Sequence, residues 1–214
     1  MKLDKQAYTQ ADFSNVIVEQ PEITRKQFTN CRFHWTDFTD VEIVYGCVFD
    51  ECNFTNARLN GVRFKDCAFL SCRFKNASFF ATVLEECKMT GSDFTDSGCS
   101  AAQIFGGDWS YTVLRKQSFQ KQNLSGIRFL GADLSHCCFN TCNLTSCQFD
   151  EAVAHETSFY KSDLRGASLQ AFPMQEAGFR QAKLDLAQCV MMAEILTEGR
   201  YTPEEEKPAA SPTF

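Results

Sequence analysis

Residues 52–74 decide the fold, and they read CNFTNARLNGVRFKDCAFLSCRF. A large apolar residue recurs in this stretch at every fifth position: Phe54, Leu59, Phe64, Phe69 and Phe74. A helix repeats its faces about every 3.6 residues and a strand every two, so neither produces a strict period of five. The chain must therefore turn a corner after each five-residue side.

The period of five extends over most of the chain. It runs from Tyr8 to Ile43 and, after one extra residue around 44–46, from Phe49 to Leu184 without a further slip. All but two of these 36 positions carry a large apolar side chain. We interpret the extra residue as a bulge at a corner, with Ile43 as the inward residue before it.

The position two residues before each large side chain is usually small, as at Cys52, Ala57 and Val62. One small and one large side chain from each side would fill a narrow square tube, while the other three, mostly polar positions would face water. Nine of the 12 cysteines fall in this small inward slot: Cys31, Cys47, Cys52, Cys67, Cys72, Cys87, Cys137, Cys142 and Cys147. Because their spacing is that of the repeat and not that of a zinc site, we interpret them as free thiols in the core.

The sequence contains no recognisable catalytic, metal-binding or cofactor-binding group. The three histidines, His34, His136 and His155, fall on outward positions, and no nucleophile is paired with them by a recurring motif. A tube filled by its own side chains has no room for a substrate pocket. We therefore expect a protein that is not an enzyme, with no metal and no cofactor.

Composition restricts the partners further. The 214 residues carry 27 acidic against 21 basic side chains, a net charge of −6, which disfavours sequence-independent binding to nucleic acid. No window reaches the roughly 18 apolar residues of a membrane span, and the first residues form no apolar signal segment. We expect a cytoplasmic protein that contacts no membrane.

Residues 97–122 form an irregular stretch of the repeat. Cys99 is undersized for its position, Gly107 replaces the small inward residue, Trp109 takes a phenylalanine site, and Gln117 and Gln122 sit in inward slots. These residues predict a locally distorted coil. Either strain or a patch that recognises a partner would account for it.

The period stops after Leu184, and residues 186–196 (LAQCVMMAEIL) predict a helix with Gly199 as its C-cap. One side of this apolar helix can cover the last coil, and a two-fold partner would cover the remainder; a monomeric cap is the alternative. The predicted dimer interface comprises Leu186, Cys189, Val190, Met191, Met192, Ala193, Ile195 and Leu196. The chain thus divides into a repeat body (1–186), a dimerisation and capping helix (187–198) and a disordered tail (199–214).

Segments 52–56 (CNFTN), 132–136 (ADLSH) and 162–166 (SDLRG) resemble the pentapeptide repeat A-[DN]-L-x-x, and the resemblance covers roughly residues 6–186. It implies an all-β solenoid, a right-handed quadrilateral β-helix with four repeats per coil. About nine coils, stacked at about 4.8 Å, would form a rod about 43 Å long. Because each coil packs only against its neighbours, the ends need caps.

Together with the terminal helix, the repeat body resembles the Qnr, MfpA and AlbG group of pentapeptide repeat proteins. That resemblance implies a homodimer, joined through the helix, that acts on DNA gyrase and topoisomerase IV as a mimic of duplex DNA. Such proteins protect the enzyme from quinolones or from a gyrase-poisoning natural product, and so confer antibiotic resistance. The long projecting loops of the Qnr members have no counterpart between Phe49 and Leu184, which favours the loop-less MfpA and AlbG type. The alternative is a scaffold of the same fold with a partner other than a topoisomerase.

Charge distribution bears on the mimicry. A 43 Å length of B-DNA carries about 25 negative charges, so a chain of net −6 cannot imitate DNA by total charge. Over residues 47–186, however, the face containing Phe49 and Phe149 sums to −3 and the opposite face to +4. We therefore expect an acidic, gyrase-facing side formed by Asp50, Glu51, Glu85, Glu86, Asp108, Asp133, Asp150, Glu151, Glu156 and Asp163. A charged face that only keeps the rod soluble is the competing interpretation.

Overall fold

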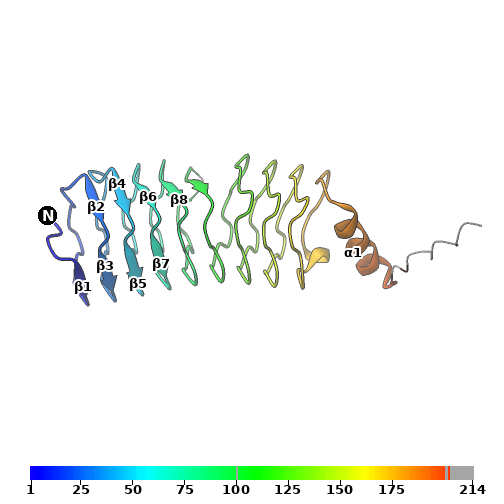
Figure 1. Cartoon of the computed structure of the whole chain (residues 1–214), viewed down its shortest axis with the longest axis horizontal. Coiled ribbons are helices and arrows are strands. Elements are labelled where there is room, and N and C mark those ends of the chain that lie inside the picture. Colours follow the sequence, from blue (N-terminus) through cyan, green and yellow to red (C-terminus); the bar gives the residue numbers. More distant parts are fainter. Residues whose placement is uncertain (100, 201, 203–214) are drawn as a thin grey trace, which may run out of the picture.

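The computed structural model describes residues 1–99, 101–200 and 202 and shows a parallel β-solenoid that ends in a helix. Its coils stack along one axis, from β1 at the N-terminal end to α1 at the other (Figure 1). The strands of the described chain are β1 (Ala7–Thr9), β2 (Glu22–Thr24), β3 (Gln27–Thr29), β4 (Ile43–Tyr45), β5 (Val48–Asp50), β6 (Arg63–Lys65), β7 (Ala68–Leu70), β8 (Val83–Glu85) and β9 (Gln103–Phe105). A 3-10 turn, η1 (Met174–Glu176), and the helix α1 (Leu186–Thr197) follow.

The strands form two parallel sheets, ordered β1-β3-β5-β7 and β2-β4-β6-β8-β9. Phe49 pairs with Phe69 and Phe64 with Leu84, so neighbouring coils are offset by 20 residues. Four five-residue sides therefore make one coil, as the resemblance implied. The large residue of each side points inward: Phe54, Leu59 and Phe74 are all fully buried.

The extra residue lies earlier than the sequence suggested. Ile23 pairs with Val44 and Phe28 with Phe49, an offset of 21. Val44 is fully buried whereas Ile43 is only half-buried, so the slip falls before Val44, and the prediction that Ile43 points inward was wrong. Both residues are apolar and β-branched, and hydrophobicity alone does not choose between them.

The strand ladders account for about five turns, fewer than the nine expected coils. Beyond them the chain continues to stack through single parallel bridges, as at Lys88↔Asp108, Asp108↔Arg128 and Arg128↔Gln148. The 20-residue offset is retained to Asp163↔Lys183, and no projecting loop interrupts the described residues between these points. The expectation of about nine coils therefore exceeds the number of turns that the strand ladders form, because the later sides pair through single bridges and not through three-residue strands.

Two kinds of corner accompany the change from strands to single bridges. At a closed corner, the N–H of the small inward residue donates to the C=O three residues earlier, as from Ala57 to Phe54 at 2.9 Å. At an open corner this bond is missing from the described chain, as at Cys52 and Cys67, and the adjoining sides extend into strands such as β5 and β7. From Gln117 to Phe172 every corner is closed.

Stacked aromatic rings fill the first part of the tube. Phe33 stacks on Phe54 and Phe49 on Phe69 with ring centroids 4.7 Å apart, while Phe49 meets Phe54 edge-to-face at 5.4 Å. Offset-stacked and edge-to-face pairs each contribute about 0.5–1.5 kcal/mol beyond the area they bury. The core is thus a continuous column of rings along the axis.

Candidate interaction surfaces

The small inward slot holds hydrogen-bond donors, which the sequence did not reveal. The Cys137 Sγ donates to the Leu114 carbonyl at 2.9 Å, and the Thr157 hydroxyl donates to the Leu134 carbonyl at 2.7 Å. Burial raises the pKa of the Cys137 and Cys147 thiols to about 12, which keeps their donating proton in place. These thiols are structural donors and poor nucleophiles or metal ligands.

The irregular stretch 97–122 keeps its place in the solenoid. β9 pairs with β8, and Trp109 is buried, but its indole N–H has no partner within the described structure. The bond from the Arg128 N–H to the Gly107 carbonyl is 3.5 Å long, against about 2.9 Å elsewhere in the stack. The distortion predicted here is therefore local to Gly107 and Trp109.

The two inward glutamines in this stretch are satisfied. The Gln117 amide donates to the Phe94 and Ser97 carbonyls at 3.2 Å each, and the Gln122 amide donates to the Ala102 carbonyl at 3.0 Å. They act as longer versions of the Thr and Cys donors in the other coils.

Helix α1 attaches to the last coil through a glutamine. The Gln188 amide donates to the Leu164 carbonyl at 2.7 Å and to the Ala167 carbonyl at 2.9 Å. Asp185 caps the helix, accepting from the Gln188 N–H at 3.0 Å, and this contact with the N–H lowers the pKa of the Asp185 carboxyl. Glu198, and not Gly199, takes the left-handed C-cap conformation, so that part of the helix prediction was wrong.

The apolar residues of α1 fall into two groups. Met191 and Met192 pack against the core of the last coil, and Val190 is half-buried. The other predicted interface residues are exposed: Leu186, Cys189, Ala193, Ile195 and Leu196. Leu186 is 80% exposed and Leu196 71% exposed, and Leu196 lines an apolar groove between α1 and η1 with Phe179. The predicted tail from Tyr201 onward lies, apart from Thr202, outside the described residues.

Four of the ten residues of the predicted acidic side are paired with cations on the same surface, and a fifth faces a histidine. Glu85 lies 2.7 Å from the Lys65 ammonium, Asp163 lies 2.7 Å from the Arg165 guanidinium, and Asp133 contacts Arg115. The Arg165 hydrogen bond holds the pKa of the Asp163 carboxyl below its usual value. Two further carboxylates lie close to a cationic or imidazole side chain: Asp108 (Arg128, 3.7 Å) and Glu156 (His136, 3.1 Å).

The remaining five carboxylates, Asp50, Glu51, Glu86, Asp150 and Glu151, form no ion pair within the described residues. Asp50–Glu51 and Asp150–Glu151 occupy equivalent positions on one side, five coils apart, because 100 residues equal five 20-residue offsets. Asp150 also accepts the Gln170 N–H at 2.7 Å, which fixes its carboxylate. The unpaired acid is therefore two separate patches and the single Glu86, and not one continuous stripe.

The opposite face keeps most of its basic character. Arg58 is neutralised by Asp37 at 3.3 Å, whereas Lys121, Lys161 and Arg180 form no ion pair in the described part of the chain. The Lys161 ammonium lies over the Tyr160 ring, 5.1 Å from its centroid. The two opposite sides of the rod thus carry charge of opposite sign.

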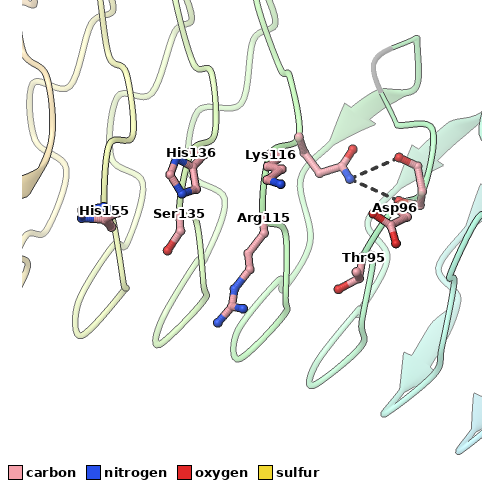
Figure 2. Close-up of a pocket in the computed structure, with 9 residues that line it drawn as sticks. Thr95, Asp96, Arg115, Lys116, Ser135, His136 and His155 are labelled. Atoms are coloured by element: carbon pink, nitrogen blue, oxygen red, sulfur yellow. Dashed lines mark hydrogen bonds between the residues drawn. The ribbon is translucent and has the colours of Figure 1, made fainter.

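A shallow groove follows one corner of the later coils (Figure 2). It begins at Thr95 and Asp96 and ends at His136 and His155. Gln117 and Ser97 also line the groove, and the Gln117 amide donates to the Ser97 carbonyl at 3.2 Å. Sequence reasoning placed the histidines outward and did not bring them together, although residues 19 apart in a 20-residue coil must lie side by side.

The comparisons with known proteins agree with this geometry. The pentapeptide repeat family matches in eight copies, over residues 44–69, 57–96, 118–147 and 139–170. The chain belongs to the pentapeptide repeat proteins. A search of curated proteins found no match. Among the described residues, no helix has the length and apolarity needed to cross a bilayer.

Solved structures of QnrB1, a plasmid-mediated fluoroquinolone resistance protein, are similar over nearly their whole length. One trypsin-treated QnrB1 variant is 23% identical, with a TM-score of 0.77, covering 92% of this chain and 99% of that chain. Full-length QnrB1 is 23% identical, with a TM-score of 0.73, covering 89% and 99%. Similarity at this level of identity establishes a common fold.

Proposed function

We propose that this chain is a non-catalytic mimic of duplex DNA that binds DNA gyrase or topoisomerase IV and changes its response to poisons such as quinolones. The observation that carries the proposal is the whole-length similarity to QnrB1, a fluoroquinolone resistance protein. A rod filled with its own side chains supports binding through an outer surface and not through a pocket. A partner of gyrase would work in the cytoplasm.

The unlike sides of the rod suggest which surface would bind. Gyrase binds DNA through a basic surface, to which the unpaired Asp50–Glu51 and Asp150–Glu151 patches are complementary. Carboxylates already paired on the rod, such as Glu85 and Asp163, would contribute less because their charge is partly neutralised. The repeat body, residues 1–186, would thus be the binding element.

We further propose that residues 187–198 join two chains into a longer rod. The exposed Leu186 and Leu196 and the groove beside Phe179 leave apolar area at the end of the solenoid, which a second copy would bury. Light scattering of the full chain should give twice the monomer mass. The double substitution Leu186→Glu and Leu196→Glu should give a monomer; a wild-type monomer would contradict the dimer.

A supercoiling assay tests the function. Gyrase is assayed with increasing amounts of the chain, with and without a fluoroquinolone. The proposal expects the chain either to restore supercoiling in the presence of the drug or to inhibit it without the drug. Supercoiling unchanged in both arms at a large excess of the chain would contradict the proposal.

A further inference from the structure

Two histidines and two glutamates meet at one corner of the later coils. His136 and Glu156 occupy equivalent corner positions in successive coils, and His155 directly precedes Glu156. The His136 Nδ1 lies 3.1 Å from a Glu156 carboxylate oxygen, and the His155 Nε2 lies 3.8 Å from the other. One ligand atom from each of these three side chains can be chosen so that all lie within 4.8 Å of one another.

We propose that this cluster binds one divalent transition-metal ion, for which Zn²⁺ is the natural choice. Zinc accepts imidazole nitrogen and carboxylate oxygen at about 2.0–2.2 Å, so tetrahedral ligand atoms lie about 3.3 Å apart. The 3.1 Å separation of His136 Nδ1 from Glu156 is close to that value, and with one ligand atom from each residue all three separations are within 4.8 Å, which rotations of exposed side chains can shorten. Three protein ligands leave the fourth position for water.

A second glutamate, Glu176, lies on the other side of His155. Its carboxylate lies 3.7 Å from the His155 Nδ1, on the opposite edge of the ring from the Nε2 that faces Glu156. A carboxylate behind a ligating histidine fixes the ring and strengthens the ligand. Glu176 would therefore be a positioning residue, and His136, His155 and Glu156 the ligands.

The backbone holds these residues in place before a metal arrives. The His136 N–H donates to the His155 carbonyl at 2.7 Å, and the Glu156 N–H donates to the Glu176 carbonyl at 2.9 Å. His136 and Glu156 have φ of 60° and 52°, so both corners are rigidly turned. In the adjoining groove the Arg115 guanidinium contacts Asp133, so its charge is neutralised there. Lys116 lies one coil before His136 and lines the same groove. The negative charges of Glu156 and Glu176 must therefore exceed the repulsion between the metal ion and the Lys116 ammonium.

Calorimetric titration of the full chain with Zn²⁺ tests the proposal. The titration uses a Cys138→Ser, Cys189→Ser background, because these are the two cysteines that are not buried. We expect one equivalent to bind, and the separate changes His155→Ala and Glu156→Gln each to weaken binding at least about tenfold. His34→Asn removes the third histidine, which lies outside the cluster, and should leave binding unchanged.

Two further readouts separate a metal site from loose surface binding. Co²⁺ in place of Zn²⁺ should give the visible absorption of a four-coordinate ion, and Glu176→Gln should weaken its binding by about tenfold while keeping the 1:1 stoichiometry. Zn²⁺ should raise the melting temperature of the parent protein but not that of His155→Ala. No saturable binding, or binding that survives both His155→Ala and Glu156→Gln, would overturn the proposal.

Discussion

The coils before Gly107 and those after it follow the same five-residue pattern but build different corners. In the earlier coils, both open and closed corners occur, and each three-residue strand directly precedes an open corner. In the later coils, from Gln117 to Phe172, all corners are closed and the sides are joined by single bridges. A repeat that looks uniform in sequence therefore contains two backbone conformations: coils with open corners and strands, and coils with closed corners only.

The inward residue does not by itself decide the kind of corner, because cysteine occupies open corners before Gly107 and the closed corners of Cys137, Cys142 and Cys147 after it. Within the described chain, six of the corners that lack the closing bond carry cysteine: Cys31, Cys47, Cys52, Cys67, Cys72 and Cys87. The bond is also missing at corners with other residues, among them Ala11, Lys26 and Gly107. At open corners the thiol lies near two carbonyls, as Cys67 does with Val44 and Lys65 at 3.3 Å each. In the closed coils the contact to the earlier carbonyl is shorter, 2.8 Å for Cys142.

Gly107 should be the position most sensitive to substitution at this boundary. A Cβ there would lie 2.2 Å from the Cys87 carbonyl oxygen, and φ is +97°, so Gly107→Ala combines a backbone clash with strain. We expect a loss of about 3 kcal/mol in the free energy of unfolding, measured by urea denaturation.

Gly126→Ala is the matched control for that experiment. Gly126 also has a positive φ, +75°, but a Cβ there would meet no atom within 4 Å. Strain alone should cost about 1 kcal/mol. Equal losses for the two variants would contradict the close approach at the boundary.

The cysteine donors provide a second, smaller test of the two kinds of corner. Cys137→Val and Cys67→Val both fill the slot, since Val62 already occupies one, but both remove the S–H donor. We expect Cys137→Val to cost about 1 kcal/mol and Cys67→Val about half as much, because the Cys137 bond is 2.9 Å and the Cys67 proton is shared between two 3.3 Å contacts. Thermal unfolding checks both, with Cys137→Ser retaining a donor as control; a larger loss at Cys67 would contradict the assignment.

Trp109→Phe should have a small effect for its size. The change loses buried surface but also removes an indole N–H that has no partner in the described structure, and these contributions oppose each other. We expect a stability change within about 1 kcal/mol by urea denaturation. Phe129→Leu, one coil further on the same face, should cost about 1–2 kcal/mol because it removes ring contacts without such relief. A larger loss of stability for Trp109→Phe than for Phe129→Leu would show that the unpaired indole N–H does not destabilise the fold.

Much of the fold follows from the sequence because the period of five leaves one geometry. The inward phenylalanines followed from this period, the four repeats per coil from the resemblance to the pentapeptide repeat, and the helix at residues 186–196 from its run of helix-forming residues. The kind of corner was not, since open and closed corners carry similar sequences and differ in one backbone hydrogen bond. The attachment of α1 through Gln188 was also missed, because an amide that satisfies two carbonyls has no hydrophobic signature.

The candidate surfaces were less predictable than the fold. Counting charges by face gave two unlike sides, but it could not show that Asp133 and Asp163 are paired with arginines. His136 and His155 were placed outward correctly, yet their contact with Glu156 depends on rotamers across two coils. Such contacts join side chains of successive coils, so they can be identified only once the pairing of one coil with the next is known.

The central claim is that one acidic side of the rod replaces DNA on a topoisomerase, and direct binding to gyrase in competition with duplex DNA tests it. The account predicts saturable binding that duplex DNA displaces. Binding should be lost when Asp50, Glu51, Asp150 and Glu151 are all changed to Lys and kept when Lys121 and Lys161 on the opposite face are changed to Gln. Absence of binding, or binding that the four acidic changes leave intact, would contradict the account.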